Sequence, residues 1–108
     1  MGGDMQPQGQ AQIISNMVDF DLGVQEAGDS PRWRHGGGSE PTGEVTPGAG
    51  LLHLESGVPA ATRKALADLG WKIGESDGSF GGYQAIERWP GRYAAATEMR
   101  KDGVALAY

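Results

Sequence analysis

Glycine makes up 19 of the 108 residues, and this abundance constrains the fold more than any other feature of the sequence. A glycine loses more backbone freedom on folding than any other residue, so the ordered state needs additional packing to offset the lost entropy. Hydrophobic residues make up 38% of the chain, which is enough for one modest core and not for two. We therefore expect residues 1–108 to be one domain, or part of one, that depends on packing partners.

Charge and the lack of cysteine exclude several classes of function. The formal net charge is -5, and the nine Lys and Arg residues are scattered, which argues against nucleic acid or an anionic membrane surface as a partner. The absence of cysteine removes disulfides, thiolate metal sites and a cysteine nucleophile. The sequence also lacks the apolar run of about 18 residues that a membrane span needs. We expect no nucleic-acid and no membrane partner, and the compartment stays open.

The spacing of apolar residues predicts a first helix over residues 5–22. Its apolar stripe indicates a well-buried helix and consists of Ala11, Ile14, Val18 and Leu22, widened by Ile13, Met17 and Phe20. Asp4 is placed to cap this helix, Pro7 fits its first turn, and Gly23 is expected to end it in a left-handed conformation. Room for one more turn follows in residues 24–27.

Strands and one further helix are expected in the rest of the chain. The expected strands are residues 32–35, 51–55 (with Leu52 and Leu54 on one face), 71–75, 80–89, 92–97 and 104–108. A helix begins near Pro59, has an apolar side of Ala61, Ala65, Leu66 and Leu69, and is capped by Gly70. Asp77-Gly78 predicts a turn, and Pro90-Gly91 predicts a type I or II turn within a slightly longer connection. This order of elements is typical of an α+β fold built in layers.

Five blocks of residues occur in a specific order along nearly the whole chain. They are GGDMQPQG at 2–9, VQEA at 24–27, PRWRH at 31–35, GYQAI at 82–86 and RKDG at 100–103. In this order and spacing they resemble the C-terminal part of the small subunit of the gamma-glutamyltranspeptidase family. The chain departs from that pattern locally, because Gln10 stands where a His is common, Glu98-Met99 where Asp-Pro is common, and Ala107 where a Gly is common.

The resemblance implies an N-terminal-nucleophile hydrolase fold, a layered αββα sandwich of which this chain is a partial piece. Such a fold is made by cutting a precursor into a large and a small subunit. The implied partners are therefore the remainder of the same precursor, namely the large subunit and the N-terminal part of the small subunit, and a small gamma-glutamyl substrate such as glutathione. No cofactor is implied. Because this piece would leave apolar faces and strand edges uncovered, we also expect self-association when it is isolated.

The resemblance also implies a site. In the family a threonine at the start of the small subunit attacks the gamma-glutamyl carbonyl, its own α-amine acts as base, and the acyl group passes to water or an amine. Gly2 and Gly3 match the consecutive glycines whose N–H groups form the oxyanion hole. Asp4 is a candidate to orient a substrate amine, with the helix cap as its alternative. The nucleophile is expected outside this chain, because none of Thr42, Thr46, Thr62 and Thr97 begins the processing motif.

Other candidate residues have simpler interpretations. His35 and His53 lack a metal-binding pattern, so no metal is expected, and Gly36-Gly37-Gly38 lacks the Lys and the Ser or Thr of a phosphate loop. Arg32 and Arg34 are interpreted as a solvated face paired with acids. The aromatic residues are expected to pack in the core or at sheet edges; they are Trp33, Tyr83, Trp89 and Tyr93.

Two alternatives to a gamma-glutamyltransferase remain at this point. One is a non-catalytic structural fragment that only assembles with the rest of the fold. The other is part of a related acylase that opens the side-chain amide of beta-lactams, because such acylases share much of the small-subunit framework.

Overall fold

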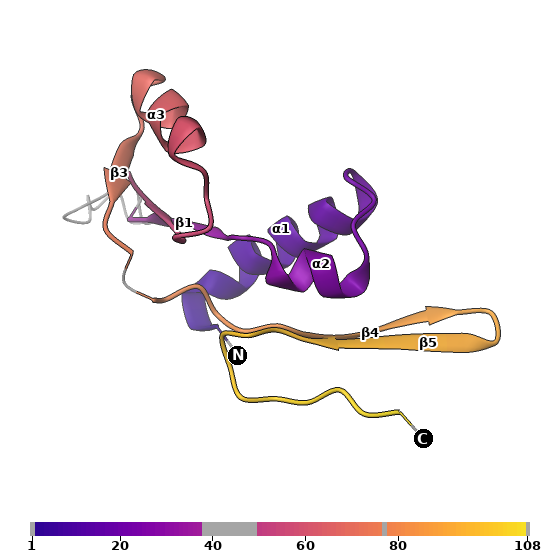
Figure 1. Ribbon diagram of the computed structural model, residues 1–108. Helices are drawn as coiled ribbons and strands as arrows, with labels where there is room; N and C mark the ends of the chain where they lie inside the picture. The colour runs from indigo at the N-terminus through magenta and orange to yellow at the C-terminus, as the bar shows by residue number, and fades with distance from the viewer. Residues whose placement is uncertain (1, 38–49, 77, 108) are drawn as a thin grey trace, which may run out of the picture. The chain divides into compact units, whose positions relative to one another are not determined.

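The computed structural model describes residues 2–37, 50–76 and 78–107, and these form two compact units. Unit 1 combines the two ends of the chain, Met1–Ser30 with Gly81–Tyr108, and unit 2 is the continuous segment Pro31–Phe80. Each unit contains both helix and strand (Figure 1). No helix in these described ranges is long and apolar enough to cross a membrane.

Unit 1 contains a short 3-10 turn, two helices and a hairpin. Their bounds are η1 (Gly3–Met5), α1 (Gln6–Val18), α2 (Val24–Asp29), β4 (Gln84–Trp89) and β5 (Arg92–Thr97). Pro7 lies in the first turn of α1, as expected from its missing N–H group. The expectation of a well-buried helix was wrong for this chain: α1 has no buried residue, and Ile14 and Val18 are 59% and 75% exposed.

The helix boundaries of unit 1 also differ from those expected. Asp4 lies inside η1, and α1 begins at Gln6 with Met5 as its N-cap and no side-chain cap, so the expected cap by Asp4 was wrong. Gly23 has φ -64 and begins α2, where its amide donates to the Glu26 carboxylate at 3.1 Å. Asp21, with φ 54, adopts the left-handed conformation that was expected of Gly23. Glycine suits the start of a helix as well as its end, so its presence alone did not distinguish them.

The β4–β5 hairpin is antiparallel, and its register runs from Gln84 opposite Thr97 to Trp89 opposite Arg92. Only Pro90 and Gly91 remain in the loop, so the expected longer connection was wrong. Gly91 has φ 76, which is what the second central position of a type II turn requires after proline. The Arg92 guanidinium lies over the Trp89 ring, 4.5 Å from its centroid, and adds a cation–π contact beside the turn.

The hairpin packs against α2 through small residues (Figure 1). Ala27 of α2 and Ala96 of β5 are buried, with 0% and 3% exposure. The Tyr83 ring occupies the space beside Gly28, because a Cβ there would lie 2.4 Å from two ring carbons. The Tyr83 hydroxyl donates a hydrogen bond to the Val24 carbonyl at 2.7 Å. The close approach of hairpin and helix thus depends on the absence of side-chain volume in α2.

Unit 2 contains a three-stranded sheet and one helix. β1 (Trp33–Gly36) pairs antiparallel with β2 (Leu51–Leu54), which pairs in parallel with β3 (Lys72–Gly74). Parallel neighbours need a crossover connection, and α3 (Ala60–Asp68) supplies it. Leu52, Leu54 and Phe80 form the buried apolar part of this unit.

The strand and the helix predicted at β2 and α3 of unit 2 are present. The alternation of Leu52 and Leu54 is confirmed, since both are buried in β2. Pro59 precedes α3, and Gly70 ends it with φ 95 while its amide and that of Trp71 donate to carbonyls of the last turn. The expected apolar side of α3 is largely exposed, since α3 has no buried residue and Leu69 is 78% exposed.

Three further expectations concern the remaining segments. No strand forms in residues 104–107, so the expected last strand is wrong in the part that the structure describes. The aromatic strand begins at Gln84 and not at Phe80, because Gly81 with φ 76 and Gly82 precede it. The glycine-rich stretch at 38–49 and Asp77 of the expected turn lie outside the described residues.

Many large apolar side chains of both units are exposed in this chain. They include Phe20 (69%), Leu69 (78%), Ile86 (73%), Tyr93 (70%), Met99 (81%), Val104 (71%) and Leu106 (78%). Apolar surface of this extent on a short chain is typical of a face that another polypeptide covers.

We predict that Gly28→Ala lowers the stability of the protein by about 1–3 kcal/mol, the usual cost of overpacking, because the new methyl group overlaps the Tyr83 ring. The thermal unfolding midpoint measures the change. Gly9→Ala is the matched control, since a Cβ at this helical glycine meets only Met5 Cε at 3.9 Å and alanine favours the helix. Equal midpoints for the two variants would contradict the packing described for α2.

We predict that the isolated 108-residue polypeptide self-associates or stays tightly bound to another chain, because its exposed apolar side chains lack a cover of their own. Analytical ultracentrifugation gives the mass of the species in solution. A compact monomer that unfolds cooperatively would contradict this prediction.

Candidate functional site

Gly2 and Gly3 have backbone conformations that favour glycine. Their φ values are 140 and 48, in the region that side chains with a Cβ rarely adopt. The Gly2 carbonyl accepts a hydrogen bond from the Met5 amide at 2.8 Å, which closes the 3-10 turn. Among residues 2–37, 50–76 and 78–107, the amides of Gly2 and Gly3 donate no hydrogen bond that would occupy them. Both N–H groups are therefore available to an acceptor from elsewhere.

The surroundings of the two glycines differ. A Cβ on Gly3 would meet no heavy atom of the described chain within 4 Å, so this residue faces open space. A Cβ on Gly2 would lie 3.4 Å from Gln6 Cγ and 3.7 Å from Gly81 Cα. The segment that leads into the hairpin thus lies beside Gly2, while Gly3 is exposed.

Asp4 follows directly and is exposed. Its carboxylate lies in the first turn of η1 without the capping hydrogen bond that the sequence had suggested. The structure therefore brings all three predicted site residues together in one short turn, with two unoccupied amides next to one carboxylate.

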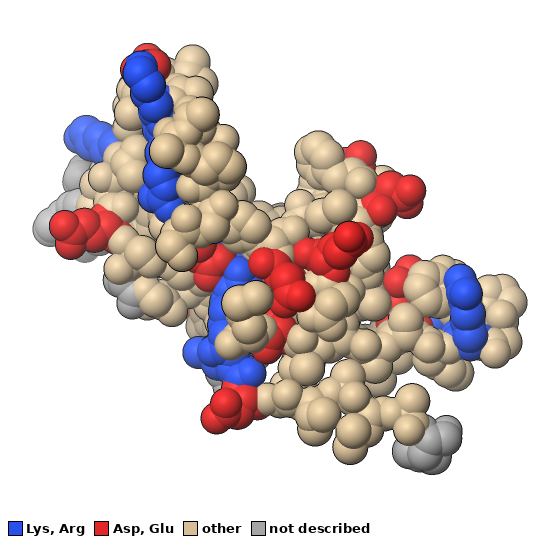
Figure 2. All heavy atoms as spheres, in the orientation of Figure 1, with Lys and Arg blue, Asp and Glu red and all other residues tan. Residues whose placement is uncertain are grey.

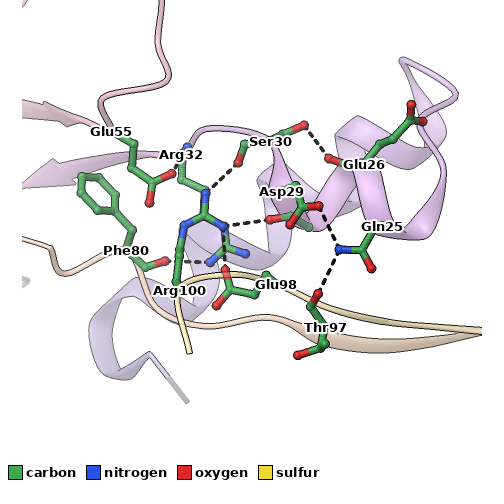
Figure 3. A network of polar contacts seen from close by, with 11 residues as sticks. Gln25, Glu26, Asp29, Ser30, Arg32, Glu55, Phe80, Thr97, Glu98 and Arg100 are labelled. Carbon is green, nitrogen blue, oxygen red and sulfur yellow. Dashed lines mark hydrogen bonds and ion pairs between the residues drawn. The ribbon is translucent and has the colours of Figure 1, made fainter. Parts of the chain in front are cut away.

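A buried ion pair joins the end of the hairpin to α2 (Figure 3). Arg100 contacts the Glu98 carboxylate at 2.6 Å, and the Glu98 side chain is 0% exposed. The Arg100 guanidinium also donates to the carbonyls of Gly28 and Ser30, at 2.9 and 3.0 Å, at the C-terminal end of α2. A cation is favoured there because the last carbonyls of a helix lack partners within the helix.

Gln25 adds a second link in unit 1, because its amide nitrogen donates to Asp29 and to the Thr97 carbonyl, both at 2.9 Å. Figure 3 shows this side chain between the helix and the end of β5. Sequence reasoning quoted the segments with Tyr83 and Arg100 as family blocks and missed their role in holding unit 1 together. The local pattern held no signal for it, because the partners lie 59 to 72 residues away in sequence.

Arg32 of unit 2 corrects another expectation. Its side chain was expected on a solvated face, but Arg32 is only 3% exposed and donates to the Phe80 carbonyl at 2.9 Å (Figure 3). Its backbone amide donates to the Glu55 carboxylate at 2.7 Å. The arginine therefore joins the two ends of unit 2 and is not placed to receive a ligand.

The aromatic residues expected to pack are only partly buried. Trp33 and Tyr93 are 42% and 70% exposed, so neither lies in a core, and both are on strands at the edge of a sheet. Tyr83 and Trp89 are half-buried. The His35 and Trp71 rings are arranged edge to face, with their centroids 6.1 Å apart. His53 Nδ1 donates a hydrogen bond to the Glu75 carbonyl at 2.6 Å. In the described part of the chain, no group of three or more His, Asp or Glu side chains is arranged to hold a metal ion.

The described threonines do not occupy positions suited to a catalytic nucleophile. Thr62 lies within α3, and Thr97 ends β5 with its hydroxyl oxygen buried. Thr42 and Thr46 lie outside the described residues.

Basic and acidic groups alternate on the face drawn in Figure 2. Lys and Arg side chains lie in separate groups over α3, in the middle of the view and over the hairpin, and carboxylates border the middle group. Carboxylates are more numerous near α1 and α2, where Asp19, Asp21, Glu26 and Asp29 lie.

Comparison with known sequences gives one family and one kind of curated relative. The family model described as Gamma-glutamyltranspeptidase matches residues 1–108. The "Acylase ACY 1 proenzyme" of Pseudomonas sp. (strain SE83) is 34% identical over 98 residues, which is 89% of this chain and 15% of the relative. The chain thus spans only a small part of the length of the curated relatives that it matches.

Comparison with solved structures shows the fold. A cephalosporin acylase from Bacillus halodurans matches 100% of this chain and 19% of its own, with a TM-score of 0.81 and 37% identity. A gamma-glutamyltranspeptidase from Pseudomonas nitroreducens, complexed with L-DON, matches 93% of this chain and 48% of its own, with a TM-score of 0.75 and 19% identity. The expected N-terminal-nucleophile hydrolase fold, with this chain as a partial piece, is confirmed.

We predict that Arg100→Gln destabilises the protein by about 3–5 kcal/mol, because it removes the Arg100 charge from the buried Glu98 carboxylate. Chemical denaturation measures the change. Lys64→Gln is the control, since the Lys64–Asp68 pair is 76% and 62% exposed and exposed pairs contribute about 0–1 kcal/mol. A loss below about 1 kcal/mol for Arg100→Gln would show that the buried pair does not hold hairpin and helix together.

Proposed function

The chain belongs to the gamma-glutamyltranspeptidase family, and from this membership we propose that it supplies the oxyanion donors of an enzyme that cleaves gamma-glutamyl amides such as glutathione. The family resemblance drawn from the five sequence blocks is confirmed by the match over residues 1–108. The observation that carries the proposal is the pair of Gly2 and Gly3 amides, which have no acceptor in the described chain.

The proposed chemistry is acyl transfer. A threonine hydroxyl, from a part of the precursor outside this chain, attacks the gamma-glutamyl carbonyl while its own α-amine accepts the proton. The carbonyl oxygen becomes negative in the tetrahedral intermediate, and the N–H groups of Gly2 and Gly3 donate to it. Such preorganised donors lower the barrier because they need no reorientation when the charge appears. Collapse of the intermediate expels the amine and leaves an acyl-enzyme for water or a second amine.

Asp4 is proposed to bind the substrate's ammonium group. Its carboxylate is exposed and lies one residue after the glycine pair, without the cap that would otherwise occupy it. Because the Asp4 carboxylate lies beside the Gly2 and Gly3 amides, it would hold the ammonium group of the acyl substrate on the same side as the carbonyl under attack. A gamma-glutamyl compound has such an ammonium group.

The rest of the same precursor is proposed to complete the site. The curated relative is named a proenzyme, and this chain spans 15% of its length. The exposed apolar residues of both units would then pack against the large subunit and the remainder of the small subunit.

A second candidate is an acylase that removes the side chain of a beta-lactam. Relatives above 30% identity support it, because those at 33%, 34% and 37% are named acylases, whereas gamma-glutamyltranspeptidase structures from Pseudomonas nitroreducens and Helicobacter pylori have 19% and 23% identity to this chain. The two candidates share the oxyanion donors and differ in the donor substrate.

We predict that the full-length natural protein releases p-nitroaniline from gamma-glutamyl-p-nitroanilide, and that Gly3→Ala lowers its kcat by about 10²-fold with KM little changed. A Cβ at φ 48 shifts the backbone that carries the amides. Gly78→Ala is the matched control, since Gly78 has φ 74 and, like Gly3, open space around it.

The isolated chain should release no p-nitroaniline, and turnover by it would place the nucleophile among its own residues. Hydrolysis of a cephalosporin side-chain amide but not of the anilide favours the acylase. Failure of the full-length protein on both substrates favours a non-catalytic fragment.

A further inference from the structure

Tyr83 connects the candidate site to the packing of unit 1. Its hydroxyl donates to the Val24 carbonyl at 2.7 Å, and its ring rests on Gly28. Its own carbonyl accepts a hydrogen bond from the Glu98 amide at 3.4 Å. The residue is therefore held at both its side chain and its backbone, by α2 and by the end of β5.

Gly81 and Gly82 directly precede Tyr83, and Gly81 lies beside Gly2. Gly81 Cα lies 3.7 Å from the position that a Cβ on Gly2 would occupy, so the Gly81 backbone runs next to Gly2. Gly82 lies between Gly81 and Tyr83. A Cβ on Gly82 would be 2.9 Å from Lys101 Cγ and 3.6 Å from the Glu98 carboxylate. Neither glycine has a side chain to fix its own position, so the position of Gly81 depends on its neighbours.

We propose that Tyr83 is a positioning residue, which holds the Gly81 backbone against Gly2 and so fixes the direction of the Gly2 and Gly3 amides. This inference rests on the proposed function, because it concerns the amides assigned there to the oxyanion. The hydroxyl bond to Val24 fixes the ring, the ring fixes residues 81–83, and these residues limit the movement of Gly2.

A positioning role differs in its kinetics from a merely structural one. The negative charge on the carbonyl oxygen is absent from the bound substrate and builds up in the transition state, so a small displacement of the oxyanion donors lowers kcat and leaves KM unchanged. A small error in placement has a large effect, since about 1 Å can cost about 10²-fold in rate. General loosening of the fold would instead reduce the amount of active protein.

The test uses Tyr83→Phe in the full-length natural protein, which removes the hydroxyl and keeps the ring on Gly28. We expect kcat to fall about tenfold with KM unchanged, on whichever of the anilide or the cephalosporin amide the wild type cleaves. Tyr93→Phe is the matched control, because Tyr93 is 70% exposed in β5 and should keep wild-type kinetics.

A second pair of variants tests the Gly81 contact. Gly81 and Gly91 both have φ 76, so alanine introduces the same backbone strain at each. A Cβ on Gly91, in the hairpin turn, would meet no heavy atom of the described chain within 4 Å, whereas Gly81 Cα lies 3.7 Å from the Cβ position of Gly2. We expect Gly81→Ala to lower kcat further than Tyr83→Phe does, and Gly91→Ala to leave kcat unchanged.

A readout without activity separates this inference from the proposed function. In protein labelled with ¹⁵N-glycine, Tyr83→Phe should shift the amide cross-peaks of Gly2, Gly3 and Gly81, and Tyr93→Phe should not. Unshifted cross-peaks, or a loss of kcat equal in both tyrosine variants, would overturn the positioning role. If the wild type cleaves neither substrate, the proposed function fails, and the cross-peaks alone decide whether Tyr83 positions Gly2.

Discussion

The close approach of the β4–β5 hairpin to α2 is the constraint on which unit 1 depends. The residues at this contact are small: Ala27, Gly28 and Ala96. Among the residues of this unit that the structure describes, only Met5 and Val24 add larger buried apolar side chains. A core with so little volume gains stability from exact fit, which the Tyr83 ring supplies against the bare backbone of Gly28. The buried Arg100–Glu98 pair and the Gln25 bond then fix the hairpin along the length of the helix.

The sequence predicted the elements whose signals are local. Alternation placed Leu52 and Leu54 inside β2, and Gly70 ended α3, because both patterns depend on neighbours within a few residues. The burial of α1 was predicted wrongly, although its stripe has helical spacing. Amphipathic spacing indicates that one face of a helix packs against something, but it does not identify what covers that face. Within this chain nothing covers Ile14 and Val18, which are exposed in the part of the structure that is described. The parallel pairing of β2 and β3 was not predicted, although the strand–helix–strand order that permits it was.

The residues of the candidate site were predicted from the sequence, and the residues that hold them in place were not. Gly2, Gly3 and Asp4 were found because they are consecutive and occur in a family block, and the φ values of both glycines are consistent with the need for glycine there. Their supports were not found, since Gly81 approaches Gly2 only after the chain has returned from unit 2. The cap assigned to Asp4 was wrong because propensity describes what a helix start permits, whereas this start already uses a 3-10 turn closed by backbone bonds.

The division of the chain into a continuous unit and a discontinuous one favours an order of folding. Pro31–Phe80 contains all the partners of unit 2, so this unit can form before the segments of unit 1 meet. Unit 1 needs residues from both of its segments, because bonds such as Arg100 to Gly28 join positions 72 apart. The Arg32 side chain binds the Phe80 carbonyl and so holds the two ends of unit 2 together, which shortens the effective loop between the segments of unit 1 and reduces the entropy lost when they meet. The inserted segment thereby assists the assembly of the unit that carries the glycine pair.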